Sequence, residues 1–213
     1  MDNTAMSFFG QMEYRINDSL TATLGLAYSD DSKDVSGDIT IIDAFAALPL
    51  EAAGLGALSG LQFFPAFRNY PNADEDGKFD SDDVTHTLSL AYAISDNTSI
   101  YATHSSGFKA TSVNMTVDAR DVRAADPEDA TNYEIGLKTT FDNGYINLAY
   151  FDQNIEGFQS NAFSGTGFNL VNAGKESHKG VELDSMLALS ENLMLRVSAM
   201  QLDAVYDSFE KGT

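Results

Sequence analysis

The sequence contains no cysteine and no tryptophan among its 213 residues. The lack of cysteine excludes a disulfide scaffold, thiolate-bound zinc and a cysteine nucleophile. Basic residues are scarce as well: 12 Lys and Arg stand against 32 Asp and Glu, which gives a formal net charge of −20. Because nucleic-acid binding depends on a basic surface, we expect no nucleic-acid partner.

The sequence also lacks a long apolar run. The nearest candidate for a transmembrane helix, residues 39–64, is interrupted by Asp43, Pro49 and Glu51, whereas a helix that crosses a bilayer needs about 20 apolar residues. The first ten residues have neither the basic nor the apolar region of a signal peptide. A membrane protein of another kind stays open, because a membrane-spanning β-strand needs no continuous apolar run.

Apolar residues recur instead at every second position. Leu20, Leu24 and Leu26 share one parity, and Thr21 and Thr23 occupy the other. The same alternation appears in residues 85–94, 132–141, 145–150, 181–189 and 193–200. Successive side chains on a strand point to opposite faces, so each segment is predicted to be a strand with one apolar and one polar face.

The polar parity carries charged residues, namely Glu134, Lys138, Glu182, Asp184 and Arg196. Burying them in a sandwich core would be costly unless each were paired, whereas a water-filled or plugged lumen accommodates them. A soluble antiparallel sheet with one wet face is the alternative. Without tryptophan, an aromatic girdle would come from Tyr and Phe near the strand ends. The candidates are Tyr14, Tyr28, Tyr92, Tyr101, Phe108, Tyr133, Phe141 and Tyr145.

Short and long connections alternate along the chain. Four short segments rich in Asn, Asp, Ser and Gly are predicted to be hairpin turns; they are residues 16–20, 94–99, 141–145 and 189–193. Long polar segments separate the hairpins at residues 31–82, 107–127 and about 158–168. The strands are therefore predicted to pair as 6–16 with 20–30, 83–94 with 98–106, 128–141 with 144–157, and 168–189 with 192–206.

With every short turn at one end and every long loop at the other, this layout is typical of outer-membrane barrels. Most of the strands also reach the roughly 9–11 residues that a tilted strand needs to cross a bilayer. The predicted fold is all-β: an antiparallel transmembrane β-barrel fragment of about eight meandering strands, with short periplasmic turns and long extracellular loops.

Four sequence fragments resemble TonB-dependent outer-membrane receptors, in the order that this family has. Residues 10–34 resemble an early hairpin, and "YATHSSGFKA" (101–110) resembles a strand-end motif. "DPEDATNYEIGLKTTFDNGYINLAYFDQNIEGFQ" and "NLVNAGKESHKGVELD" are similar to the hairpin and the strand that follow. The motif residues are Gly107, Phe108, Lys109, Pro127, Glu128, Tyr133, Glu134, Gly136, Lys138, Asn172, Gly174, Gly180 and Glu182.

The strand-end motif also has a local interpretation. Gly107 is expected to release the backbone from the strand ladder, Phe108 to lie at the membrane interface, and Lys109 to reach headgroups or the lumen. An ordinary strand end is the alternative interpretation.

The resemblance implies a receptor of the bacterial outer membrane that imports a scarce nutrient, most commonly a ferric siderophore. Cobalamin, haem and glycans are other ligands in this family. The implied partners are outer-membrane lipid, a small-molecule metal chelate and the TonB inner-membrane complex, which acts through a plug domain. The resemblance implies neither a cofactor nor an enzymatic reaction.

Family members have about 22 strands and an N-terminal plug. The chain is therefore interpreted as part of the C-terminal half of the barrel, without the plug, and is not expected to transport alone. The alternative is a complete eight-stranded outer-membrane barrel with a structural or adhesion role, in which residues 6–16 would pair with 192–206. A third alternative is a soluble binding module of the β-sandwich type.

Candidate ligand contacts lie in the long loops. Phe63, Phe64 and Phe67 could contact an apolar ligand group or only anchor their loop, and Arg120 and Arg123 could bind an anionic chelate or form local ion pairs. A possible calcium loop has oxygen ligands at alternate positions around Gly77. It comprises Asn72, Asp74, Asp76, Asp80 and Asp83, and a solvated acidic loop is the more ordinary interpretation.

The three histidines, His86, His104 and His178, are far apart in sequence and predict no metal site. A hydrolase would need a nucleophile beside a base. His104 and Ser105 point to opposite faces of a strand, whereas His104 and Ser106 share a face, although the sequence identifies no third group. No enzymatic activity is predicted.

Overall fold

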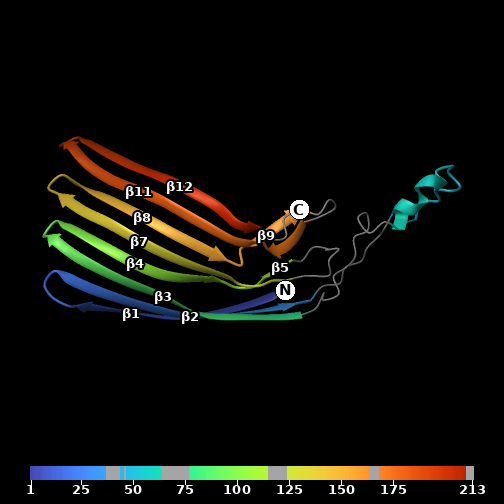
Figure 1. Ribbon diagram of the computed structural model, residues 1–213, viewed down its shortest axis with the longest axis horizontal. Helices are drawn as coiled ribbons and strands as arrows, with labels where there is room; N and C mark the ends of the chain where they lie inside the picture. The colour runs from blue at the N-terminus through green and yellow to red at the C-terminus, as the bar shows by residue number, and fades with distance from the viewer. Residues whose placement is uncertain (37–43, 46, 64–76, 115–123, 164–167, 210–213) are drawn as a thin grey trace.

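The computed structural model describes residues 1–36, 44–45, 47–63, 77–114, 124–163 and 168–209. Eight long strands form one antiparallel sheet with the order β1-β2-β3-β4-β7-β8-β11-β12 (Figure 1). They are β1 (Asp2–Arg15), β2 (Leu20–Val35), β3 (Gly77–Ser95), β4 (Thr98–Lys109), β7 (Glu128–Phe141), β8 (Gly144–Glu156), β11 (Gly174–Ser190) and β12 (Leu193–Phe209). The neighbours in space are neighbours in sequence, as predicted for a meander.

Five shorter elements lie in the long connections. They are the 3₁₀ helix η1 (Gly56–Phe63) and the strands β5 (Ser112–Val113), β6 (Ala124–Ala125), β9 (Gln159–Phe163) and β10 (Phe168–Asn172). β5 pairs with β6, and β9 pairs with β10, each as a separate two-stranded sheet. No helix among the described residues is long and apolar enough to cross a membrane.

The four predicted hairpins are confirmed, with different bounds. β2 continues to Val35 and β3 begins at Gly77, so the first long connection is shorter than predicted. The predicted strand 168–189 is divided into β10 and β11, because Gly174 has a φ of 123° that breaks the extended backbone.

The four short turns lie together at one end of the sheet (Figure 1). The side chain of Asn17 accepts hydrogen bonds from the backbone N–H groups of Ser19 and Leu20, both at 2.9 Å. Asn97 and Asn143 instead bind the next strand, since the Asn97 carbonyl accepts from Thr140 N (2.9 Å) and the Asn143 carbonyl from Ala188 N (2.7 Å). The turns therefore also connect each hairpin to its neighbour.

The strand register gives the sheet one apolar face and one polar face. Residues directly opposite each other share a face, and one such row joins Met12, Leu24, Leu88, His104 and Tyr133 across five strands. On the next three strands this row continues into the charged residues Asp152, Lys179 and Asp203. The next row joins Tyr14, Ala22, Leu90, Ala102, Ile135, Tyr150 and Val181. A groove of about 660 Å³ is lined by residues of both rows.

Both edges of the sheet are open. β1 pairs only with β2, and β12 only with β11; within the described strands no pairing joins β1 to β12. Every residue of β1 is exposed, and β12 has one half-buried residue, Ser208. The sheet is a partial barrel that does not close, so the complete eight-stranded barrel is not favoured.

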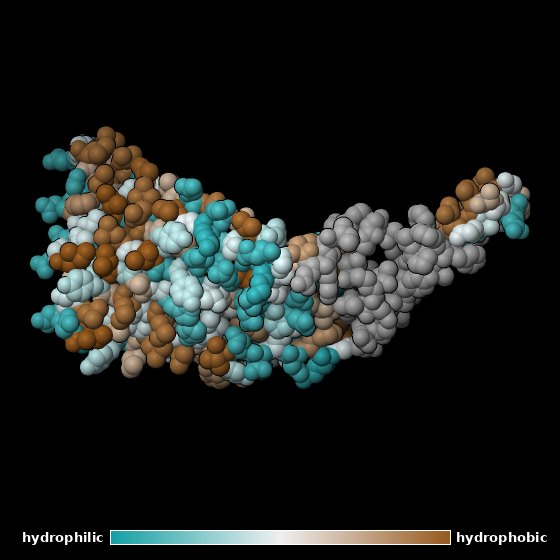
Figure 2. Space-filling view, viewed as in Figure 1, coloured by the Kyte–Doolittle hydropathy of each residue, from teal (hydrophilic) through white to brown (hydrophobic). Residues whose placement is uncertain are grey.

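The sheet buries few side chains. On the face in view in Figure 2, most hydrophobic side chains gather toward the short turns and most hydrophilic ones toward the long connections. Leu90 is 52% exposed although it lies near the middle of the apolar face. Most of the buried residues lie where the long connections leave the sheet, and include Ala125, Glu128, Gln159, Val171, Ala173 and Glu176.

Candidate functional site

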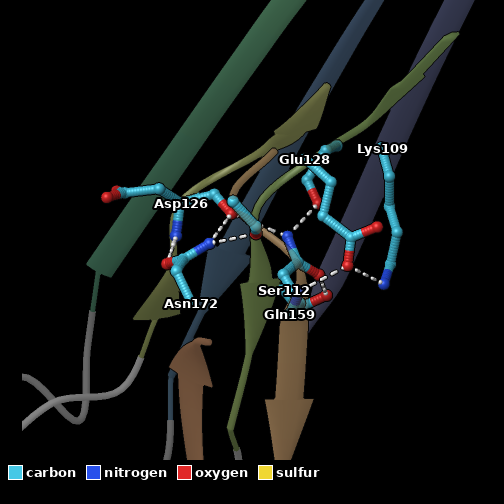
Figure 3. A network of polar contacts seen from close by, with 8 residues as sticks. Lys109, Ser112, Asp126, Glu128, Gln159 and Asn172 are labelled. Atoms are coloured by element: carbon cyan, nitrogen blue, oxygen red, sulfur yellow. Dashed lines mark hydrogen bonds and ion pairs between the residues drawn. The ribbon is translucent and has the colours of Figure 1, made fainter. Parts of the chain in front are cut away.

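A network of polar side chains ties the long connections to the strand ends, and we call it the loop-base network (Figure 3). It consists of Lys109, Ser112, Asp126, Glu128, Gln159 and Asn172. These residues come from β4, β5, the segment before β7, β7, β9 and β10. The network therefore joins segments that lie far apart in sequence.

Glu128 is the charged centre of the network. Its Oε1 accepts a hydrogen bond from the backbone N–H of Gln159 at 2.6 Å and lies 2.9 Å from Lys109 Nζ. The side chain of Glu128 is only 11% exposed, whereas that of Lys109 is 54% exposed. A buried carboxylate needs such partners, because desolvation of an unpaired charge is costly. The ion pair thereby joins the first residue of β7, Glu128, to the last residue of β4, Lys109.

The Gln159 and Asn172 amides satisfy backbone groups of the neighbouring connections. Gln159 Nε2 donates to the carbonyls of Ala110 (3.1 Å) and Asp126 (2.8 Å), and the Ser112 hydroxyl donates to Gln159 Oε1. Asn172 Nδ2 donates to the carbonyls of Asp126 and Gly157. In return, Asn172 Oδ1 accepts from Asp126 N at 2.8 Å. Both side-chain amides have specific partners, so the two loops are fixed relative to each other.

Two glycines allow the chain to turn beside this network. Gly157 has a φ of 70°, and a Cβ there would lie 2.9 Å from the Pro127 carbonyl oxygen. Gly174 has a φ of 123°, and a Cβ there would overlap the Ser208 carbonyl oxygen. Because both obstacles are backbone atoms, any side chain would force the strands apart. Motif residues Pro127 and Gly174 therefore have a steric role.

A second group of motif residues lies on the polar face of the sheet. Tyr101 O–H donates to Glu134 Oε1 at 2.6 Å, and Lys138 Nζ lies 4.9 Å from the centroid of the Tyr101 ring. The ring covers Gly136, where a Cβ would overlap the ring carbon Cε1. Glu134, Gly136 and Lys138 of β7 thus hold the Tyr101 ring of β4 flat against the sheet.

A polar hollow of about 420 Å³ adjoins this group on the same face. It is lined by Ser105, Asn132, Glu134, Phe151, Gln153 and Glu182, among others. The Phe151 ring covers Gly180, since a Cβ there would lie 2.6 Å from the ring. Both carboxylates, Glu134 and Glu182, line the same hollow. The polar face therefore offers negative charge toward whatever it encloses.

The structure corrects three expectations about individual residues. Tyr101 and Tyr145 belong to the polar face, where Tyr101 binds Glu134, so they are not girdle residues of the apolar face. Gly107 does not release the backbone, because it is paired with Ala130 of β7. β4 separates instead from its other neighbour, β3, beyond the pair of Thr87 and Ser105. The expectation for Lys109 is not among these corrections: it forms an ion pair with Glu128, and its odd position places it on the polar face with Tyr101 and Ser105.

The predicted loop contacts fall largely outside the described residues. Phe64, Phe67, Arg120 and Arg123 lie outside them, and Phe63 ends η1 with an undescribed side chain. Their contact with a ligand stays a prediction.

Three residues of the predicted calcium loop, Asn72, Asp74 and Asp76, also lie outside the described residues, so calcium binding stays a prediction. Asp80 and Asp83 lie in β3 at positions of opposite parity, so their carboxylates point to opposite faces of the strand.

Sequence reasoning missed the histidine pair on the apolar face. His86 Nε2 lies 3.0 Å from His104 Nδ1, and Ser106 Oγ lies 3.0 Å from His86 Nδ1. Ser106 Oγ also accepts the backbone N–H of His86 at 3.0 Å. The pairing of residues 83–94 with 98–106 was the signal that could have brought these side chains together.

Comparison with known proteins identifies the fold. The family model described as "TonB dependent receptor-like, beta-barrel" matches residues 1–211. No curated protein sequence matches the chain significantly.

Solved structures of similar fold include uptake receptors and a copper transporter. The ferric yersiniabactin uptake receptor FyuA of Yersinia pestis superposes with a TM-score of 0.67 and 17% identity, over 97% of this chain and 28% of the receptor. The copper transporter OprC superposes with a TM-score of 0.65 and 13% identity, over 95% of this chain and 29% of the transporter. The ferripyoverdine receptor of the outer membrane of Pseudomonas aeruginosa, solved with ferripyoverdine bound, superposes with a TM-score of 0.63 and 15% identity. The match covers 98% of this chain and 24% of the receptor. The chain thus spans 24–29% of the length of these three proteins.

Proposed function

The chain belongs to the TonB-dependent receptor β-barrel family, and from this premise we propose that it forms part of the barrel wall of an outer-membrane receptor for a metal chelate. A ferric siderophore is the proposed cargo. The observation that supports this most directly is the open eight-stranded sheet, which superposes on 24–28% of two receptors for ferric chelates.

The two faces of the sheet suit the two surroundings of a barrel wall. We assign the apolar face, with its groove of about 660 Å³, to lipid acyl chains, and the polar face, with Glu134 and Glu182, to the water-filled or plugged lumen. The short turns then lie on the periplasmic side and the long connections on the extracellular side. The open edges of β1 and β12 would continue into further strands of the same barrel, because unpaired edges are not stable in lipid.

The family is one of transport receptors, and the proposed function involves binding and import with no covalent change of the cargo. The loop-base network gives the extracellular loops a fixed foundation from which they can contact a chelate. Movement through the barrel would depend on the plug and on the TonB complex of the inner membrane. By this proposal, residues 1–213 alone do not transport.

Import can be tested in a strain that lacks the complete receptor gene. The strain is grown with single ferric chelates as the iron source, with and without the intact gene, and uptake of each radiolabelled ferric chelate is measured. We expect the intact gene to restore growth and uptake on at least one chelate, and a tonB deletion to abolish this gain. If no chelate depends on the gene, the import proposal fails.

The orientation of the faces can be tested separately with spin labels attached to introduced cysteines, since residues 1–213 contain no native cysteine that would also be labelled. Single cysteines replace Leu90 and its neighbour Ser89 in the complete receptor, and each carries a spin label in liposomes. Oxygen concentrates in lipid and is expected to relax the label that replaces Leu90. A water-soluble nickel chelate is expected to relax the label that replaces Ser89. The reverse result would place the apolar face toward the lumen and contradict the assignment.

A further inference from the structure

Two histidines of the apolar face meet on neighbouring strands near the polar end of that face. His86 of β3 and His104 of β4 are both half-buried, their ring centroids lie 4.9 Å apart, and Nε2 of the first lies 3.0 Å from Nδ1 of the second. We propose that His86 and His104 form a two-imidazole site for a divalent transition-metal ion, with Cu²⁺ as the preferred ion and Ni²⁺ and Zn²⁺ as weaker alternatives.

The distance between the two nitrogens suits chelation. Imidazole nitrogens bind such ions at roughly 2.0–2.1 Å, so two nitrogens 3.0 Å apart subtend an angle of about 90° at the metal. That angle corresponds to adjacent positions of the tetragonal geometry that Cu²⁺ and Ni²⁺ adopt. Copper is placed first because it heads the general affinity order for nitrogen ligands. In the metal-free pair the same two atoms share a hydrogen bond.

Metal binding requires a change of tautomer and a rotation of the rings, because both lone pairs must turn from the line between the two nitrogens toward the ion. One of the facing nitrogens, His86 Nε2 or His104 Nδ1, carries the shared hydrogen, and this ring must move its hydrogen to its other nitrogen. For His86 that other nitrogen is Nδ1, and Ser106 Oγ lies 3.0 Å away as an acceptor. No net proton is released, and both imidazoles stay neutral, which is the state that binds metals.

Ser106 has the position of an outer-sphere partner. Metal-bound histidines usually donate their second ring N–H to an oxygen, which fixes the ring orientation. Ser106 Oγ is itself held in place by the backbone N–H of His86 at 3.0 Å. On the other side, the ring of Tyr133 packs against His104 with centroids 4.6 Å apart. Both imidazoles are therefore held beside each other before any ion arrives.

The site lies at a fork in the sheet. The ladder between β3 and β4 ends at the pair Thr87 and Ser105, while both strands continue. Among the described residues no group of three or more His, Cys, Asp or Glu side chains is placed to hold a metal, so water would complete the coordination. The residues beside the pair toward the loops, Ser106 and Thr131, are polar, which gives water access to the pair.

The test measures metal binding by the complete receptor in detergent after treatment with a chelator. CuCl₂ is titrated calorimetrically, and the bound ion is observed by electron paramagnetic resonance, in the wild type and in the variants His86→Gln, His104→Gln and His178→Gln. His178 is the third histidine of the chain and serves as the matched control. Heat-modifiable migration in gels checks that each variant is folded.

We expect the wild type to bind one Cu²⁺ whose spectrum shows two nitrogen ligands and disappears in the His86→Gln and His104→Gln variants. His178→Gln should bind as the wild type does, and Ser106→Ala should weaken binding by about tenfold. The proposal is overturned if the His86→Gln and His104→Gln titrations match the wild type, or if His178→Gln loses the same ion.

If a variant fails to fold, the site is tested on the wild type by modifying its histidines with diethyl pyrocarbonate in the presence and absence of Cu²⁺. Mass spectrometry measures the extent of modification at each histidine. Cu²⁺ should protect His86 and His104 but not His178, and equal modification with and without Cu²⁺ would overturn the site. The readout is metal binding, so its outcome is independent of whether the receptor imports a ferric chelate.

Discussion

The eight-stranded sheet and the loop-base network are stabilised in opposite ways. In the sheet, large apolar side chains such as Leu90, Phe9 and Met200 are exposed, and the strands are joined by backbone hydrogen bonds. In the network, Glu128 and Gln159 are buried and are bound by specific side-chain contacts. The sheet therefore depends on surfaces that surround it, whereas the network is satisfied by the chain itself.

This difference predicts which substitutions each region tolerates. The apolar face should tolerate changes of shape among apolar residues but not a charge, because its surroundings are hydrocarbon in our proposal. The network should be sensitive to the loss of single atoms, since a buried polar group without its partner costs about 1–3 kcal/mol. The predictions below test this contrast.

The largest effect is expected from a charge on the apolar face. Leu90→Arg places a guanidinium near the middle of that face and should lower the free energy of unfolding of the complete barrel in liposomes by about 2–4 kcal/mol. The control is Ser89→Arg, one position along the same strand on the polar face, for which a much smaller loss is expected. Equal losses would show that the two faces do not differ in their surroundings.

A side chain at Gly174 should have the next largest effect. Its φ of 123° and the Ser208 carbonyl oxygen, which a Cβ at this position would overlap, both oppose any larger residue. Gly174→Ala is expected to cost about 1–3 kcal/mol and to expose the β9–β10 hairpin to proteases. Gly107→Ala is the control, because a Cβ there would make an ordinary 3.6 Å contact with Ala130. If both variants unfold alike, backbone strain at Gly174 is unimportant.

The ion pair of Lys109 and Glu128 should contribute less. Glu128→Gln keeps an acceptor for Gln159 N but removes the charge, and Lys109→Met removes the other charge. A double-mutant cycle on the free energy of unfolding should give a coupling of about 1 kcal/mol, since Lys109 is half exposed and solvent screens the pair. A coupling indistinguishable from zero would leave the hydrogen bond to Gln159 as the only role of Glu128.

The sequence predicts the sheet well, because alternation is a local property. Leu20, Leu24 and Leu26 are separated by residues of the other parity, and the short turns fix the partner of each strand. The register then follows wherever one face is apolar. The network could not be predicted in the same way, because its contacts, such as that between Asp126 and Asn172, join residues in different loops. The motif residues indicated a family, and the structure shows that several of them act together.

Parity also explains the errors about single residues. Tyr101 was expected at the interface because it lies near a strand end, yet its odd position places it with Thr103 and Ser105 on the polar face. Likewise, the histidines are 18 residues apart in sequence. Only the strand pairing, Leu88 opposite His104, shows that His86 is the diagonal neighbour of His104.

The smallest predicted effect lies between the two regions, where β2 and β3 continue past the apolar face toward the loops. The Ser32 hydroxyl donates to Asp80 Oδ1 at 2.7 Å and, with a smaller contribution from Lys78, lowers the pKa of the exposed Asp80. A lowered pKa means that this carboxylate stabilises the fold above its ordinary pKa, and the contribution is lost as the pH falls through the lowered value. Ser32→Ala should raise the pKa of Asp80, as followed by NMR of the labelled carboxyl carbon, with little change in stability. An unchanged titration would show that the strand extensions beyond the apolar face are joined by their backbones alone.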